Sequence, residues 1–342
     1  MIPAQQGPHK ALTVALDSRV DGVVGELIAA WARTWNTLAP LWAQAAQAAA
    51  DDPTPGRRRR ADRYAAALEA TRTAMEDLVD MAGATMTTAL PDLVTDAATG
   101  EVEIITAGLP GGSATTLGVS WGRIDPAALD AIITRATEQI TSLAWPIVDA
   151  VHDMLGAQLA AGIAAGDNPR VVARRIAAAA RDAVNMGLDR ALTIARTEML
   201  DAHRAATAAT DRAHRDVVAH WEWEATLDRR TCGACLSMHG RRFDLDEDGP
   251  EGHQQCRCAR NPVTKSWREL GFDLDEPPSI TPDARAWFNA QPVAVQRDIL
   301  GPGVHALYAS GAVGWEQLAV RRSNPGWRDS VVPPRLADLQ PA

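Results

Sequence analysis

The sequence predicts a mainly α protein with an α+β part: an elongated helical N-terminal body, a small zinc-bound α+β module and a short helical tail. Long stretches carry apolar residues at every third or fourth position, which is the helical period. One short segment, residues 220–226, alternates in the manner of a strand, and all four cysteines lie within residues 232–258. We therefore expect three regions: residues 1–165, 166–265 and 266–342.

The composition limits the class of protein. With 342 residues, 46% hydrophobic and 23% charged, the chain has the composition of a globular protein with a sizeable core. No run of about 18 apolar residues occurs, so we expect no membrane span. The N-terminal sequence lacks the basic and apolar regions of a secretion signal. The net charge of −9 argues against a general nucleic-acid coat protein.

Residues 11–49 are predicted to be helical. Trp31, Trp35, Leu38 and Trp42 recur at helical spacing and so form one stripe. This stripe either packs in the core or docks on a partner. Pro40 lies within the run, and we expect a kink or a break there because proline removes a backbone hydrogen bond.

Residues 51–56 are rich in turn-forming residues, and a basic run opens the next helix, which we expect to end near Leu90. The run contains Arg57, Arg58, Arg59 and Arg60. Positive charge at a helix N-terminus opposes the helix dipole. These arginines therefore indicate an anionic partner, such as DNA phosphate or an acidic protein, or else a solvated helix face.

The segment 99–122 combines β-prone residues with a centre rich in glycine and proline at residues 108–112, and we expect a hairpin or exposed arm there. Helix resumes after Asp125, bends or divides at Pro146, and stops near Gly166. Another helix begins at Pro169, and a long Ala/Arg-rich helical segment covers about 188–218.

The cysteines point to a metal. Cys232 and Cys235 form a Cys-x2-Cys pair, and His253, Cys256 and Cys258 follow after 17 intervening residues. Zinc prefers four tetrahedral thiolate and imidazole ligands, and such paired spacing is typical of structural sites. We expect Cys232, Cys235, His253 and one of the last two cysteines to bind Zn²⁺.

Several alternatives to a structural zinc stay open at this stage. They are two disulfides, free thiols, a catalytic zinc, and a Cys–His nucleophile with His239 or His253. A catalytic zinc would need an open coordination position and a nearby base such as Asp248 or Glu251. The matching functions are a zinc-dependent nucleic-acid hydrolase or a zinc-ribbon adaptor.

An ordered set of motifs resembles the phage Mu protein F-like family of minor head morphogenesis proteins over about residues 166–320. The motifs are Ile194-Ala-Arg196-Thr-Glu198, Trp221-Glu-Trp223, Asp228-x2-Thr231-Cys232-x2-Cys235, Gly240-x2-Phe243, His253-x2-Cys256-x-Cys258, Pro262-Val263, and a tail set from Ala286 to Gly311. Residues 1–165 are similar only in being helical. One departure is Gln254-Gln255, where the family tends to have Pro-Asn.

The resemblance implies a non-catalytic protein present in few copies per virion. Such proteins associate with the portal protein and with the inner capsid, built from the major capsid protein or a scaffold, and assist head assembly or DNA delivery. The resemblance also implies assembly in the host cytoplasm followed by residence inside the capsid near the portal. No enzymatic activity is implied for this module.

Two further features bear on partners. Arg196 and Glu198 lie on neighbouring positions of a predicted helix, and they form either a salt bridge between helices or an interaction site at the portal. Between Arg170 and Arg242 there are 13 arginines and nine acidic residues, so we expect weak, salt-sensitive contact with packaged DNA.

The proline-punctuated tail is expected to form short helices at 282–290, 292–300 and 314–320.

Overall fold

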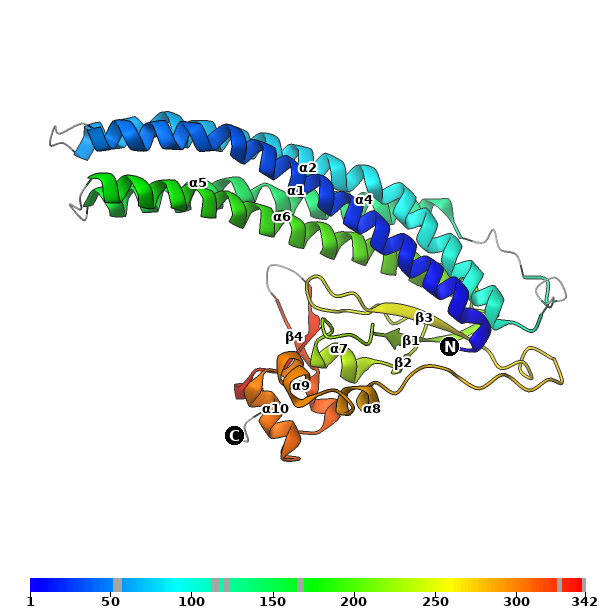
Figure 1. Cartoon of the computed structure of the whole chain (residues 1–342). Coiled ribbons are helices and arrows are strands. Elements are labelled where there is room, and N and C mark those ends of the chain that lie inside the picture. The colour runs from blue at the N-terminus through cyan, green and yellow to red at the C-terminus, as the bar shows by residue number, and fades with distance from the viewer. Residues whose placement is uncertain are drawn as a thin grey trace. The chain divides into compact units, whose positions relative to one another are not determined.

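The computed structural model describes residues 1–51, 57–111, 113, 117–119, 124–164, 169–324 and 328–339. It is mainly helical, as predicted (Figure 1). The helices are α1 (Gln6–Asp51), α2 (Arg57–Gly108), α4 (Pro126–Ala144), α5 (Pro146–Ala164), α6 (Pro169–Ala213), α7 (Gly233–Met238), α8 (Ala284–Asn289), α9 (Val293–Leu300) and α10 (Pro302–Ala309). The strands are β1 (Val218–Glu224), β2 (Arg242–Phe243), β3 (Ala259–Thr264), β4 (Val320–Arg322) and β5 (Ser330–Val332). Within the described part of the chain, none of the helices is both long enough and apolar enough to span a bilayer.

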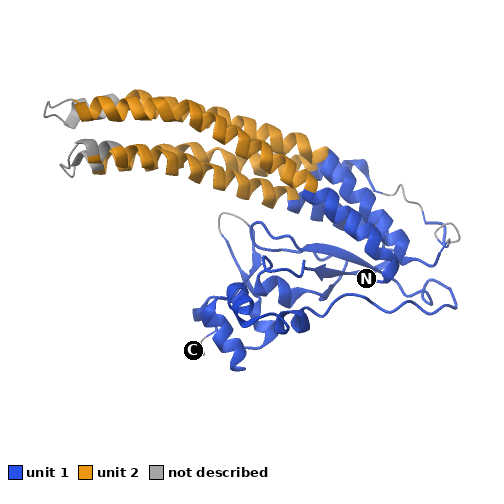
Figure 2. Ribbon diagram, in the orientation of Figure 1, with its two compact units in different colours: residues 1–17, 92–132, 200–342 blue, residues 18–91, 133–199 orange. Residues whose placement is uncertain are grey.

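The chain divides into two compact units (Figure 2). Unit 1 contains residues 1–17, 92–132 and 200–342, and unit 2 contains residues 18–91 and 133–199. Helices α1, α2, α4 and α6 contribute residues to both units. The cysteines all belong to unit 1.

Unit 2 is a helical bundle whose core includes the predicted tryptophan stripe. Trp31 and Trp42 are 2% and 1% exposed, so the stripe packs in the core. The indole N–H of Trp42 donates to the hydroxyl of Thr71 on α2 at 2.9 Å. At Gly187 of α6 an added Cβ would lie 2.9 Å from Cε of Met75 on α2, so glycine allows these two helices to approach closely.

Two predictions about the prolines have different outcomes. Helix α1 continues through Pro40, so the predicted break is wrong. The cost of the lost hydrogen bond is about 3 kcal/mol, and burial of the large side chains on both sides of the proline offsets it. At Pro146 the predicted division is confirmed, because α4 ends at Ala144 and α5 begins at Pro146.

The predicted hairpin arm is wrong for residues 99–108, which are the last turns of α2, and so is the predicted helix end near Leu90. Burial here follows the helical period at residues 97, 98, 101, 104 and 105. The β-branched run suggested a strand, and the buried charged residue Glu101 concealed the helical pattern. Residues 112, 114–116 and 120–122 of the predicted arm lie outside the described residues, as do 52–56 and Gly166.

A three-stranded antiparallel sheet forms the centre of unit 1, in the order β2-β1-β3. The predicted strand at 220–226 is confirmed as β1, where Trp221 is paired with Phe243 on β2 and with Pro262 on β3. The Trp221 ring stacks on Phe243 with centroids 4.4 Å apart. The sheet therefore brings the segment before α7 and the loop before β3 to the same part of unit 1.

The tail also belongs to unit 1, and its short helices match the prediction. They are α8, α9 and the 3-10 turn Trp315–Leu318, while α10 was not predicted. Phe288 of α8 is fully buried and lies 5.6 Å from the ring of Trp315. Both pack in one cluster with Leu236 of α7, so the tail covers the helix that carries Cys235.

Candidate metal centre

The first two cysteines meet at the start of α7. Cys232 is the N-cap of this helix, and its sulfur accepts a hydrogen bond from the backbone N–H of Cys235 at 3.5 Å. A short N-terminal turn thus brings both sulfurs of the Cys-x2-Cys pair to one side, as the spacing predicts. Cys235 is buried and Cys232 is half-buried.

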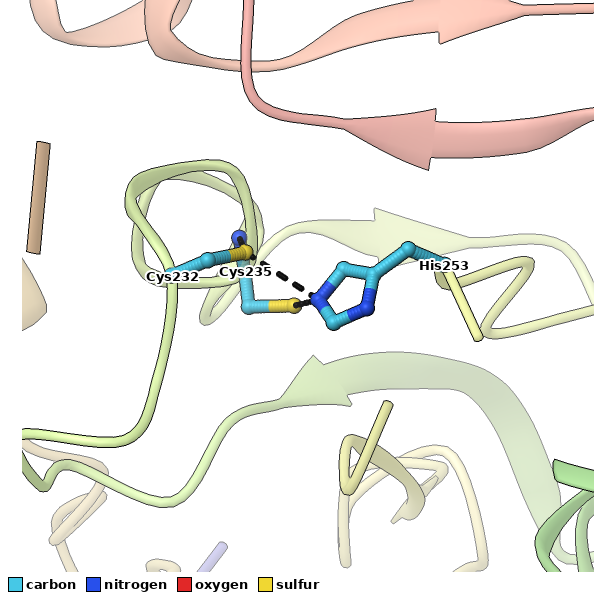
Figure 3. Close-up of side chains that lie close together, drawn as sticks. All are labelled: Cys232, Cys235 and His253. Carbon is cyan, nitrogen blue, oxygen red and sulfur yellow. Dashed lines mark hydrogen bonds between the residues drawn. The ribbon is translucent and has the colours of Figure 1, made fainter. Parts of the chain in front are cut away.

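His253 comes from the loop between β2 and β3, and its Nε2 points at both sulfurs (Figure 3). Its Nδ1 donates to the carbonyl oxygen of Gln254 at 2.7 Å. That bond keeps a proton on Nδ1, so Nε2 is the nitrogen that can bind a metal once it has lost its own proton. The carbonyl oxygen of Gln254, on one side of the ring, therefore orients Nε2 on the other side toward the two sulfurs.

Three distances between donor atoms are close to the edges of a zinc tetrahedron. Nε2 of His253 lies 3.3 Å from Sγ of Cys232 and 3.7 Å from Sγ of Cys235, and Sγ of Cys235 lies 3.6 Å from Sγ of Cys256. Zinc–sulfur bonds of about 2.3 Å and zinc–nitrogen bonds of about 2.05 Å imply tetrahedral edges of about 3.8 Å for S···S and about 3.6 Å for S···N. The five predicted donors form two groups of mutually close atoms that share Cys235, one with Cys232 and His253 and one with Cys256 and Cys258.

All four cysteines are free thiols in the structure. The 3.6 Å between the sulfurs of Cys235 and Cys256 is far longer than the roughly 2.05 Å of a disulfide bond. The two-disulfide alternative therefore does not describe this structure.

The electrostatics of these side chains favour a thiolate at Cys232 beside a protonated imidazole at His253. The hydrogen bond with the Cys235 thiol, followed by that with His253, lowers the pKa of Cys232 to about 5. The same contact with Cys232 raises the pKa of His253 to about 9. Hydrogen bonds from neighbouring thiols also lower the pKa of Cys256, whereas burial raises the pKa of Cys258. The hydrogen bond with Cys232 raises the pKa of Cys235 as well, so Cys235 and Cys258 both favour the protonated thiol.

Gly252 allows the loop to close on the cysteines. A Cβ at this position would lie 2.2 Å from Sγ of Cys256, which is closer than non-bonded atoms come. We expect Gly252→Ala to displace Cys256, to lower the free energy of unfolding by about 1–3 kcal/mol and to weaken metal binding.

The measurement is thermal unfolding together with zinc content. Gly83→Ala is the matched control, because a Cβ there meets nothing within 4 Å, and alanine is the better helix former. Equal zinc content in the Gly252→Ala variant and the wild type would contradict the expected clash.

The departure at Gln254-Gln255 carries a cost in backbone conformation. Gln255 has φ of 59°, the one non-glycine residue with positive φ among the described residues. Asparagine tolerates this left-handed region better than glutamine does. Glutamine here therefore keeps the loop at some cost in backbone strain.

Three of the candidate catalytic groups are engaged in bonds away from the cysteines, whereas His253 lies beside Cys232. Nδ1 of His239 accepts from the N–H of Ala225 at 3.0 Å, and its Nε2 lies 3.1 Å from the carbonyl oxygen of Pro282. Glu251 pairs with Arg321 at 2.6 Å, and Asp248 pairs with Arg212 at 2.6 Å. Neither carboxylate belongs to the two donor groups.

The remaining predicted site residues do not join the cysteines. Arg196 and Glu198 lie on α6 within unit 2, where Arg196 is half-buried and Glu198 is 6% exposed. Arg57, Arg58, Arg59 and Arg60 form the first turn of α2, and their side chains lie outside the described part. An interaction role for these six residues stays a prediction.

Sequence reasoning missed a buried charged cluster of Glu101, Asp211 and Arg260. Nε of Arg260 donates to Oδ2 of Asp211 at 3.0 Å, and both side chains are fully buried. The guanidinium lies 4.3 Å from the ring centroid of Trp221. Both carboxyl oxygens of Glu101 and Oδ1 of Asp211 find no N–H or O–H donor in the described part of the chain. Burial and the nearby charge of Asp211 together favour the protonated form of Glu101.

This cluster predicts a pH dependence of stability. Burial, followed by the charge of Asp211, raises the pKa of Glu101 well above its ordinary value. The folded protein therefore holds a proton that the unfolded chain releases. The contribution of Glu101 is fully present below its ordinary pKa and is lost as the pH rises through the raised value, at about 1.4 kcal/mol per pH unit.

We expect Glu101→Gln to reduce this loss at alkaline pH, as measured by urea unfolding at acidic and alkaline pH. Glu103→Gln, at an exposed position of the same helix, should leave the pH dependence unchanged. The same alkaline loss in Glu101→Gln and wild type would show that another group binds the proton.

The comparison with known families gives one match. Residues 153–260 match the family model described as Phage Mu protein F like protein. The matched segment includes β1, α7 and the five predicted metal donors. No curated protein and no solved structure matches this chain.

Proposed function

From the match of residues 153–260 to the Phage Mu protein F-like family, which confirms the resemblance carried by the motifs, we propose that the chain is a minor protein of a phage head. It takes part in head morphogenesis and associates with the portal protein and the inner capsid. There it assists assembly of the head, packaging of the DNA or its delivery. The family match is the observation that carries this proposal.

The second part of the proposal is a structural zinc bound by Cys232, Cys235, His253 and Cys256. Three of the six distances between these four donors agree with the edges of a zinc tetrahedron, and Cys256 is grouped with Cys235 and Cys258 and not with Cys232 and His253. Cys258 is then the neighbouring thiol outside the coordination sphere. Four protein ligands leave no open position for a substrate, so the role of the metal is to hold the fold.

A non-catalytic role is further supported by the surroundings of the donors. The carboxylates nearest in sequence, Asp248 and Glu251, are both in ion pairs with arginine. A zinc-dependent nucleic-acid hydrolase would need a free general base beside the metal. The partners that we propose are the portal protein, the major capsid protein or scaffold, and packaged DNA through non-specific, salt-sensitive contacts.

Quantitative mass spectrometry of purified particles, with and without the packaged genome, tests the proposed function. We expect a few to a few tens of copies per particle, which is the range of a minor head component. If the protein is lost from particles that have released their genome, it leaves the head together with the DNA. Absence from mature particles would overturn a stable place in the virion and would favour a transient assembly factor or an enzyme.

A further inference from the structure

Arg204 of α6 is a buried arginine bound to the loop that supplies two of the proposed zinc ligands, His253 and Cys256. We call residues 251–258 the metal loop. The Arg204 side chain is 6% exposed, and its Nε donates to the carbonyl oxygen of Cys258 at 2.8 Å. Its Nη2 donates to the carbonyl oxygen of Cys256. The guanidinium therefore binds the backbone on both sides of Arg257.

The third donor of Arg204 is used by Asp201, one turn earlier on α6. Nη1 of Arg204 donates to Oδ1 of Asp201 at 2.6 Å, and the same oxygen accepts from Nη2 of Arg328 at 2.8 Å. Arg328 also donates to the carbonyl oxygen of Gly252 at 3.3 Å. Two arginines joined by one carboxylate thus hold both ends of the metal loop.

The charges of this network are complementary to those of the proposed metal centre. Zn²⁺ with three thiolates and one imidazole carries one net negative charge. Arg204, Arg328 and Asp201 together carry one net positive charge. A buried ion is costly unless an opposite charge lies beside it, so the network offsets the net negative charge of the occupied centre.

We propose that Arg204 is a positioning residue of the metal centre, which orients the metal loop and supplies the counter-charge for the bound metal. This inference rests on the proposed zinc site. A purely structural role is the competing explanation, in which Arg204 joins α6 to the metal loop equally well with and without metal. The two explanations differ in whether removal of Arg204 changes zinc binding or only stability.

The experiment compares zinc affinity, by competition with a chromophoric chelator, in the wild type, Arg204→Gln and Arg204→Lys. Residues outside the first coordination shell typically change metal affinity by about 10–100-fold. We expect Arg204→Gln to bind zinc about 10–100-fold more weakly, and Arg204→Lys, which keeps the charge, to be weakened less. Zinc should raise the melting temperature of Arg204→Gln less than that of the wild type.

Arg212→Gln is the matched control. Arg212 lies on the same helix and also donates to a backbone carbonyl, of Leu245 at 2.9 Å, and to a carboxylate, of Asp248 at 2.6 Å. It does not contact the metal loop through either bond. We expect its zinc affinity to equal that of the wild type.

The outcomes separate this inference from the proposed function. A wild-type protein without zinc affinity would remove the zinc site itself. Zinc affinity of Arg204→Gln equal to wild type, or an equal loss of stability with and without zinc, would overturn the role of Arg204 and leave the zinc site standing. Failure of both variants to fold even with zinc would also overturn it, because Arg204 would then serve the fold alone.

Discussion

Replacing Arg260 with methionine is expected to lower the free energy of unfolding by about 3–5 kcal/mol. The substitution keeps much of the apolar volume but removes the cation paired with Asp211 in a site where both side chains are fully buried. It also leaves a second buried carboxyl, that of Glu101, near Asp211. Three further interactions are lost, namely the contact with the Trp221 ring and the hydrogen bonds to the carbonyl oxygens of Glu247 and Gly249.

Urea unfolding at neutral pH measures this effect, and Arg242→Met is its control. Arg242 pairs with Glu222 at 3.0 Å, but its side chain is 66% exposed, so we expect a loss below about 1 kcal/mol. The double variant Arg260→Met/Asp211→Asn should recover part of the loss, because no charge is then left unpaired. A similar small loss in Arg260→Met and Arg242→Met would mean that the buried pair contributes little.

The second large effect is expected for Cys235→Ser. Cys235 belongs to both groups of close donors, so its loss should abolish zinc binding. Structural zinc contributes binding free energy on the order of 10 kcal/mol, and a small module with short strands depends on it to fold. We expect residues 220–262 to unfold while the N-terminal helices stay largely intact.

Zinc content per chain and circular dichroism measure this outcome. The near-UV tryptophan band should weaken, because Trp221 and Trp223 pack in one cluster with Cys235, while the far-UV helical signal should change little. Cys258→Ser is the control, since Cys258 lies outside the proposed coordination sphere and should retain zinc. A near-UV spectrum of Cys235→Ser identical to that of the wild type would contradict the stabilising role of the metal.

The sequence predicts the local features of the molecule well. Trp221 and Trp223 identify β1 by their alternation, and the spacing of Cys232, Cys235 and His253 identifies donors that the fold does bring together. In both cases the partners are close in sequence or have a chemistry that only a few residue types share. A metal ligand can be recognised without knowledge of the tertiary fold.

Contacts between distant segments could not be predicted in the same manner. Glu101, Asp211 and Arg260 are three common charged residues on three separate elements, and no spacing rule connects them. The same holds for Arg204, whose two backbone acceptors carry no sequence signature at all. Glu101 also interrupts an apolar helical pattern, and for this reason the sequence predicts a hairpin where the last turns of α2 lie.

The different sequence separations within unit 1 have a consequence for the order of folding. All the metal donors lie between Cys232 and Cys258, whereas the charged cluster joins segments that are far apart along the chain. Closing a long loop costs more entropy and takes more time than closing a short one. We therefore expect the metal centre to assemble during synthesis, soon after Cys258 leaves the ribosome, and the charged cluster to close afterwards. The yield of folded chains would then depend on the supply of zinc during translation. Their rate of unfolding would depend on the buried ion pair of Arg260 and Asp211.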